Sequence, residues 1–308
     1  MIKFLKKKAR EFYEEVFVYW RKSKSKWTEE ELIAGLMDVY ERNHGYRFDI
    51  KNPVTFTEKV QWYKLYFKRE GIENVVDKAL FKKYIDEKIG EGNVIPMYNY
   101  WTSFKQFKKD WKNLPETFVL KATLSSDSKG VKIIKKKSET DFKKVEKEIK
   151  LWFDEKRSLI NSYCSAYYNA TPGVLAEEYM EEADGQLPDY KFMCFSGKPF
   201  CAYVIKNQFK GSGNRRFTFY DLEWNVMDVR YGKSIPEPEE KPKHFDEMLK
   251  CAEILSKDFP FVRVDFFDTD KKFYVAELTL YPGGGLYPFN PMEFNKHMGD
   301  LFVLPEDK

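Results

Sequence analysis

Apolar residues recur every three to four positions along roughly the first ninety residues, which is the spacing of one face of an α-helix. Residues 28–43 begin with Thr28 and carry Glu31 three positions later, a pattern typical of a capping box at a helix N-terminus. The same spacing predicts helices at about 57–68 and 77–88. This part of the chain is therefore predicted to be helical.

Short runs rich in β-branched and aromatic residues begin at Val94 and predict strands instead. One hairpin is predicted to turn at Ser196, Gly197 and Lys198, and further helices are predicted at 141–156 and about 243–257. The predicted strands lie in VIPMYNYW, FVLKATL, VKIIKK, GVLAEEYM, YKFMCFSGKPFCAYVI and RRFTFYDLEWNVMDVRY. This order of elements indicates an α+β fold of packed layers.

The segment FVRVDFFDTDKKFYVAELT is a second predicted hairpin that turns within DTDKK. In this register Asp265 lies opposite Glu277 and Arg263 lies opposite Thr279, and these side chains share one face of the sheet with Val275. Two facing carboxylates repel each other, whereas a divalent cation between them attracts both. Oxygen ligands of this kind suit Mg²⁺ that also binds nucleotide phosphates. The alternative is a solvated sheet face that carries charges.

Lysines on other predicted strands lie where they could reach such phosphates. Lys121 is followed by the small polar segment SSDSKG, whose hydroxyl and N–H groups could wrap phosphate oxygens. Lys191 and Lys206 lie on the two strands of the first hairpin, and Arg216 follows them. A cluster of cations beside paired carboxylates is what a metal–nucleotide complex requires. The alternative is that these strand lysines are simply solvated.

Composition narrows the class of protein only slightly. The 308 residues are 43% hydrophobic and 18% aromatic, which is typical of a folded globular protein and excludes a disordered one. The formal net charge of +4 gives no reason to expect a nucleic-acid partner. The four cysteines lack metal-binding spacing, and no cleavable signal or apolar stretch of about 18 residues is present. We therefore expect a reduced, cytoplasmic protein.

Residues 1–26 hold most of the basic surplus, with nine Lys or Arg against three Glu. Their apolar residues recur at helical spacing, so a basic amphipathic helix is predicted. Such a helix can bind anionic lipid peripherally, at the inner face of the membrane. The alternative, which we favour, is that its apolar face packs against the rest of the protein.

The order of these motifs resembles that of ATP-grasp proteins, specifically the TupA-like branch similar to the teichuronopeptide-biosynthesis ligases of bacterial polysaccharide loci. The resemblance spans about residues 50–290. It is carried by PVTFTEKVQWYKLY, DKALFKKYI, LPETFVLKATLSSDSKGVKII, LAEEYM, LPDYKFMCFSGKP, YDLEWN and FPFVRVDFFDTDKKFYVAELTLYPGGG. It implies an ATP-grasp fold, in which two α+β lobes hold ATP between them.

The resemblance also implies a division of the chain and a role for each matched residue. It implies a helical N-terminal region (1–93), a central lobe with a phosphate-covering hairpin (94–180) and a C-terminal lobe with a metal-binding hairpin (181–308). Lys121 and Lys191 would reach the ATP phosphates, and we expect Lys206 beside them. The other residues assigned to ATP are Ser125, Ser126 and Ser128 over the phosphates, Glu177, Glu178 and Tyr179 at the adenine, and Asp189 at the ribose or the acceptor.

For the metal and the reaction, the resemblance assigns Asp265 and Glu277 as Mg²⁺ ligands. The usual third metal position is an Asn, which is replaced here by Thr279, a weaker neutral ligand. Arg263 and Arg216 are the candidates that would stabilise an acyl phosphate. The loop after Lys121 is also poorer in glycine than the commoner type.

The function implied is that of an ATP-dependent carboxylate–amine ligase, which forms an amide through an acyl phosphate with ATP and Mg²⁺. The expected partners are a small-molecule or sugar-linked carboxylate, such as a uronic-acid-type sugar of a capsular or exopolysaccharide precursor, and an amine or amino acid. One alternative is a phosphotransferase or glycosyl-transfer enzyme of polysaccharide biosynthesis. Another is a nucleotide-binding module without ligase activity, which Thr279 and the glycine-poor loop would favour.

Overall fold

The computed structural model describes residues 28–125, 130–153, 164–167, 169–180, 189–206, 216–232 and 234–306. The amphipathic helix predicted in residues 1–26 lies outside the described residues, as do Ser126, Ser128 and the side chain of Lys206. None of the described helices is both long enough and apolar enough to cross a membrane.

Helices form the first part of the described chain: α2 (Glu29–His44), α3 (Phe56–Tyr66), α4 (Ile72–Val76) and α5 (Leu80–Ile89). The predicted capping box is confirmed, because Thr28 Oγ1 accepts from the Glu31 N–H and the Glu31 carboxylate accepts from the Thr28 N–H. A capping box also begins α3, formed by Thr55 and Glu58. The two further predicted helices are confirmed as α3 and α5, whereas the short α4 was not predicted.

A four-stranded antiparallel sheet follows in the order β1-β4-β2-β3. On β2, Phe118, Leu120 and Ala122 face a hydrophobic core, which leaves Lys121 on the opposite face, as strand alternation predicts. That core is closed by α6 (Phe104–Asp110) and α7 (Phe142–Ile149). The strands are β1 (Met97–Trp101), β2 (Phe118–Ala122), β3 (Val131–Ile134) and β4 (Val174–Glu177).

A five-stranded antiparallel sheet has the order β10-β9-β5-β6-β7. The predicted turn between β5 and β6 is confirmed at Ser196 and Gly197, which have φ angles of 47° and 82°. The strands are β5 (Asp189–Phe195), β6 (Lys198–Lys206), β7 (Arg216–Tyr220), β9 (Phe261–Asp268) and β10 (Phe273–Thr279). The other elements of this half are α9 (Phe245–Ser256), α10 (Met292–Leu301) and the short pair β8 (Arg230–Tyr231) and β11 (Phe289–Asn290).

In the hairpin of β9 and β10, the charged residues pair in the predicted register. Asp265 pairs with Glu277, and Arg263 pairs with Thr279. A bulge between Val275 and Glu277 shifts the register toward the turn, so Val275 pairs with Phe266. Val275 is therefore only 1% exposed and belongs to the hydrophobic core. The prediction that it shares the charged face is wrong.

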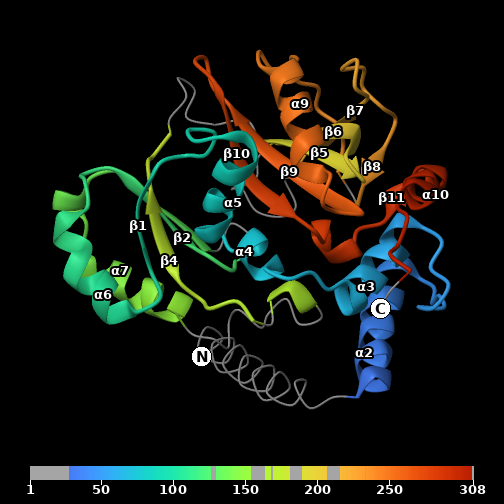
Figure 1. The fold of residues 1–308 in the computed structure, drawn as a ribbon, viewed down its shortest axis with the longest axis horizontal. Coiled ribbons are helices and arrows are strands. Elements are labelled where there is room, and N and C mark those ends of the chain that lie inside the picture. Colours follow the sequence, from blue (N-terminus) through green and yellow to red (C-terminus); the bar gives the residue numbers. More distant parts are fainter. Residues whose placement is uncertain are drawn as a thin grey trace, which may run out of the picture.

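Helices α3, α4 and α5 pack in the same core as the five-stranded sheet, whereas Leu36 and Met37 of α2 belong to a smaller cluster with Ile50 and Trp62. Phe56 of α3, for example, contacts Phe261 of β9 edge-on, with ring centroids 4.8 Å apart. Figure 1 shows α4 and α5 between the two sheets, and α3 beside α10. The domain boundaries expected after residues 93 and 180 stay a prediction. The fold brings α5 into contact with both sheets.

Candidate functional site

Asp265 is the centre of a buried charge cluster on the five-stranded sheet. Lys191 lies directly opposite Asp265 in the β5–β9 register, and Arg263 is two residues away on the same face of β9. Arg263 Nε donates to Asp265 Oδ1, and Arg263 Nη2 and Lys191 Nζ both donate to Oδ2, each over 2.6 Å. Only 1% of the Asp265 side chain is exposed, and its carboxylate is paired with two cations.

Lys191 also pairs with Asp189, over 2.6 Å. Burial alone would lower the pKa of Lys191, but Asp189 and Asp265 outweigh it and raise that pKa. Burial raises the pKa of Asp189, whose Oδ1 is buried and has no hydrogen-bond partner within the described part of the chain. This oxygen can accept a hydrogen bond from a ligand hydroxyl or N–H. The assignment of Asp189 to the ribose or the acceptor stays a prediction.

Glu277 is more open than Asp265, with 31% of its side chain exposed. Its Oε1 accepts from Lys78 Nζ over 2.8 Å, and Lys78 Nζ also donates to the backbone oxygen of Ser125 over 2.7 Å. Burial alone would raise the pKa of Glu277, but Lys78 and Arg263 outweigh it and lower the pKa to about 2. Each of the two facing carboxylates thus has its own cations. These cations offset the expected repulsion between Asp265 and Glu277.

Lys121 belongs to a second cluster, on the four-stranded sheet. Lys121 Nζ forms an ion pair with Glu177 Oε1 on the neighbouring strand β4, and Glu177 Oε2 accepts from Lys82 Nζ of α5 over 2.9 Å. Burial alone would raise the pKa of Glu177, but the two lysines outweigh it and lower that pKa. Backbone groups of Glu177 were assigned to the adenine. The structure adds that its carboxylate fixes the position of two lysines.

The two clusters come together because α5 reaches both sheets. Lys78, just before α5, pairs with Glu277, whereas Lys82 pairs with Glu177. Lys121 Nζ lies 5.9 Å from the ring centroid of Phe267 on β9, so the two sheets approach each other here. Lys78 and Lys82 were not assigned from the sequence. Their spacing of four in DKALFKKYI, which places both near one face of a helix, is the signal that could have found them.

The donor set on β9 and β10 suits Mg²⁺ by chemical type, because it offers two carboxylates and a hydroxyl. Asp265 already uses both oxygens, and Thr279 Oγ1 accepts from Arg263 Nη2 over 2.9 Å. Glu277 therefore offers the oxygen that is most open to a cation. Within the ranges that the structure describes, no group of three or more His, Cys, Asp or Glu could hold a metal alone. Water and nucleotide oxygens would have to complete the coordination.

The remaining predicted residues within the described part of the chain are Ser125, Glu178, Tyr179 and Arg216. The Glu178 N–H donates to the Pro96 oxygen over 2.9 Å, and Tyr179 has Lys135 Nζ 5.6 Å from its ring centroid. A Cβ on Gly130 would collide with the Ser125 side chain, so these residues touch only because residue 130 is a glycine. In the β6–β7 register, Arg216 pairs with Lys206.

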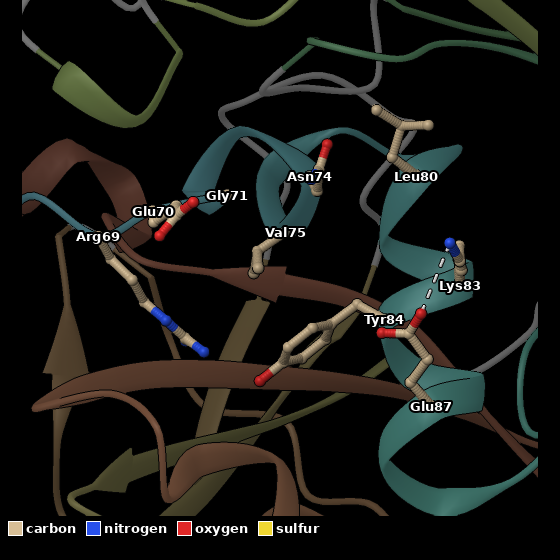
Figure 2. Close-up of a pocket in the computed structure, with 9 residues that line it drawn as sticks. All are labelled: Arg69, Glu70, Gly71, Asn74, Val75, Leu80, Lys83, Tyr84 and Glu87. Carbon is tan, nitrogen blue, oxygen red and sulfur yellow. Dashed lines mark ion pairs between the residues drawn. The ribbon is translucent and has the colours of Figure 1, made fainter.

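A separate surface pocket lies beside α4 and α5 (Figure 2), with a volume of about 390 Å³. Arg69 and Tyr84 point toward each other from its two sides, and both bond to Asp258. Lys83 pairs with Glu87 across one turn of α5. The side chains that could bind an anion here are thus already paired with carboxylates. None of the lining residues belongs to the two clusters.

Comparison with protein-family profiles identifies the family of this chain. A sequence profile described as TupA-like ATP-grasp matches residues 58–303, which is well over half of the chain. The protein is therefore an α+β protein of the ATP-grasp class. It belongs to the TupA-like ATP-grasp family, as the sequence resemblance predicted. No match was found among curated proteins.

Solved structures of several ligases are distantly similar. A D-alanine–D-alanine ligase from Helicobacter pylori has 15% identity and a TM-score of 0.42, over 82% of this chain and 69% of its own. The enzyme of the same name from Bacillus anthracis has 20% identity and a TM-score of 0.38, over 67% and 57%. The ATP-grasp ligase PsnB has 9% identity and a TM-score of 0.38, over 68% and 54%. The chain thus spans little more than half the length of the last two.

Proposed function

We propose that this protein is an ATP-dependent carboxylate–amine ligase that forms an amide through an acyl phosphate. One observation supports this most directly: cations from both sheets and from the α5 segment are held in place around a single region by buried or half-buried carboxylates. Fixed positive charge of this kind stabilises the charge that develops on a transferred phosphoryl group. The cations are Lys78, Lys82, Lys121, Lys191 and Arg263.

In the first proposed step, a carboxylate oxygen of the acid substrate attacks the γ-phosphorus of ATP. The new oxygen–phosphorus bond forms as the bond to the ADP oxygen breaks. Lys121 and Lys191 hold the phosphates, while Arg263 offers its guanidinium to the acyl phosphate. Glu277, with Asp265 and Thr279 beside it, would hold Mg²⁺, and the ion would neutralise charge on the phosphates.

In the second proposed step, the nitrogen of an amine attacks the acyl carbon and phosphate departs. An amide bond forms, the carbon–oxygen bond to phosphate breaks, and the amine proton passes to the departing phosphate. No side-chain nucleophile is needed, so the residues act by positioning the two substrates and by electrostatic stabilisation. Arg263 can serve both steps, since the phosphoryl oxygens of the acyl phosphate carry charge as they are transferred in the first step and as phosphate departs in the second.

The acid substrate in this proposal is a uronic-acid-type sugar of a capsular or exopolysaccharide precursor, and the amine is an amino acid or a related compound. The resemblance to teichuronopeptide-biosynthesis ligases supports this choice. The reaction would take place in the cytoplasm, where ATP and activated sugars are available. For residues 1–26, contact with the inner face of the membrane stays the less favoured alternative to packing against the rest of the protein.

An ADP-release assay with purified protein, ATP and Mg²⁺ tests the reaction. We expect release only when a nucleotide-activated uronic acid and an amino acid are both present, with an amide in the product by mass spectrometry. Release with the sugar alone would instead indicate the phosphotransferase or glycosyl-transfer alternative. ATP binding without turnover across a panel of acids and amines would indicate a nucleotide-binding module.

A further inference from the structure

Tyr203 of β6 is a neutral member of the row of paired residues that crosses the candidate site. In the register of the five-stranded sheet, Tyr203 pairs with Lys191 of β5, and Lys191 pairs with Asp265 of β9. Directly paired residues point to the same face of an antiparallel sheet. Tyr203 therefore lies on the face that carries the charge cluster, although no sequence pattern assigned it to the site.

The Tyr203 hydroxyl is bonded to Arg263, the residue proposed to stabilise the acyl phosphate. Arg263 Nη1 donates to Tyr203 Oη over 2.9 Å, and Tyr203 is 2% exposed and Arg263 9%. The Tyr203 ring is itself held in place, because it stacks on Phe219 of β7 with ring centroids 4.8 Å apart. The hydroxyl is thus an acceptor whose position is fixed by the packing of the sheet.

The guanidinium of Arg263 has five N–H donors, and protein acceptors account for four of them. Asp265 accepts from Nε and from Nη2, and Thr279 accepts from the other N–H of Nη2. Tyr203 accepts from one N–H of Nη1. Within the ranges that the structure describes, the second N–H of Nη1 donates to no protein acceptor. The donor that is left for a substrate oxygen is therefore on the nitrogen that Tyr203 holds.

Tyr203 holds this arginine without cancelling its charge, in contrast to Asp265. Burial raises the pKa of Tyr203 and outweighs the opposing effects of Arg263 and Lys191, so the hydroxyl stays protonated and neutral. A neutral acceptor fixes the direction of a cation, whereas a carboxylate also neutralises it. Electrostatic stabilisation of a transferred phosphoryl group needs both a fixed direction and a charge that is still available.

We propose that Tyr203 is a positioning residue: its hydroxyl holds the Nη1 end of Arg263, so that the remaining N–H points toward the acyl phosphate. The inference rests on the proposed ligase function. Tyr203 does not contact the substrate in this proposal and acts only through Arg263. Loss of its hydroxyl should therefore affect the transition state, in which the phosphoryl oxygens carry charge, more than the binding of ATP, which other cations hold.

Tyr203→Phe removes the oxygen and keeps the ring that stacks on Phe219. We expect kcat for ADP release to fall by about tenfold and KM for ATP to stay within about twofold, because the lost contact acts in the transition state. Tyr220→Phe is the matched control: Tyr220 is also buried on this sheet, but its hydroxyl accepts from the Glu239 N–H over 2.6 Å. It should keep the parent kcat. An equal fall in both variants, or none in Tyr203→Phe, would overturn the proposal.

Nuclear magnetic resonance of the protein without substrates tests the contact itself and needs no activity. Hydrogen bonds slow rotation about the Cζ–N bonds of a guanidinium, so the Nη protons of a held arginine give separate signals. In arginine-labelled protein we expect separate Nη1 signals for Arg263 in the parent and in Tyr220→Phe, and merged signals in Tyr203→Phe. Arg263→Lys identifies these signals by their loss.

The two measurements distinguish failure of this inference from failure of the proposed function. Separate Nη1 signals in Tyr203→Phe would overturn the positioning role, whatever the kinetics. A parent protein that releases no ADP with any acid and amine would instead remove the ligase function, and the signals would still show whether Tyr203 holds Arg263.

Discussion

The charge clusters on the two sheets differ in balance. On the four-stranded sheet, Glu177 holds Lys82 and Lys121, so one positive charge is in excess. On the five-stranded sheet, the charges are equal in number, with Asp189, Asp265 and Glu277 against Lys78, Lys191 and Arg263. An excess cation suits a phosphate directly. A balanced cluster presents both oxygen ligands and cations, so it can bind a metal ion and phosphate together only if some of its ion pairs separate.

Arg263→Met gives the largest expected effect on stability, because it leaves Asp265 buried with Lys191 alone. Breaking a buried pair in this way costs about 3 to 5 kcal/mol. Urea unfolding measures the change in the free energy of unfolding. Lys121→Met is the control from the other sheet: 19% of the Lys121 side chain is exposed, and Glu177 would keep Lys82. Equal losses in both variants would show that the two clusters do not differ as described.

Glu277→Gln should lower the rate of ADP release by about 10²-fold or more. Loss of a residue that contacts a metal only indirectly already lowers metal affinity or activity by about 10- to 100-fold. It should also reduce the stability of the metal-free protein by about 1 to 3 kcal/mol, because Lys78 loses a charged hydrogen bond. Steady-state kinetics over a range of Mg²⁺ concentrations checks the first effect. Glu253→Gln, at an exposed position of α9, is the control and should retain full activity. A similar loss of activity in both variants would argue against Glu277 as a metal ligand.

Lys121→Ala should weaken the binding of an ATP analogue by about tenfold, which corresponds to about 1.4 kcal/mol for one charged contact. Equilibrium titration measures the dissociation constant. The free energy of unfolding should change little, since the Lys121 side chain is partly exposed. Lys191→Ala is not a suitable second test of phosphate binding. Lys191 is buried between Asp189 and Asp265, so its loss would also destabilise the fold. Unchanged affinity in Lys121→Ala would remove the phosphate assignment from the four-stranded sheet.

The smallest expected effect is on the pH dependence of unfolding. The pKa of Glu277 is lowered from 4.5 to about 2, so its ion pair stabilises the folded protein above about pH 4.5. This stabilisation is lost as the pH falls through 2. The parent should therefore lose roughly 1 kcal/mol more than Glu277→Gln between pH 5 and pH 2, after allowance for partial exposure. Denaturant unfolding at both pH values measures the free energy of unfolding. An equal loss in the parent and in Glu277→Gln would contradict this prediction.

The local parts of this architecture could be predicted from the sequence. The pairing of Asp265 with Glu277 follows from strand alternation and the position of one turn. The capping box at Thr28 and the face of β2 that carries Lys121 also depend only on nearby residues. The bulge that moved Val275 into the core could not be predicted, because no residue in the strand requires it.

The ion pairs could not be predicted for a different reason. Lys78 and Lys82 contact residues that lie 199 and 95 positions away in the chain, through the placement of α5 between two sheets. Arg263 was assigned to the acyl phosphate, but the structure shows that it also neutralises Asp265 within its own strand. Sequence patterns identified the residue types of the site, whereas the partners of each charge depend on tertiary packing.

The position of Lys78 has a consequence for the order in which ligands bind. A phosphate that attracts Lys78 would leave Glu277 without its ion-pair partner, whereas Glu177 would keep Lys82 when Lys121 turns to a phosphate. The nucleotide would thus make Glu277 available to a divalent cation and leave Glu177 ionised. By thermodynamic linkage, the factor by which nucleotide raises the affinity for the cation equals the factor by which the cation raises the affinity for nucleotide. Positive cooperativity between the two ligands would follow from a single lysine.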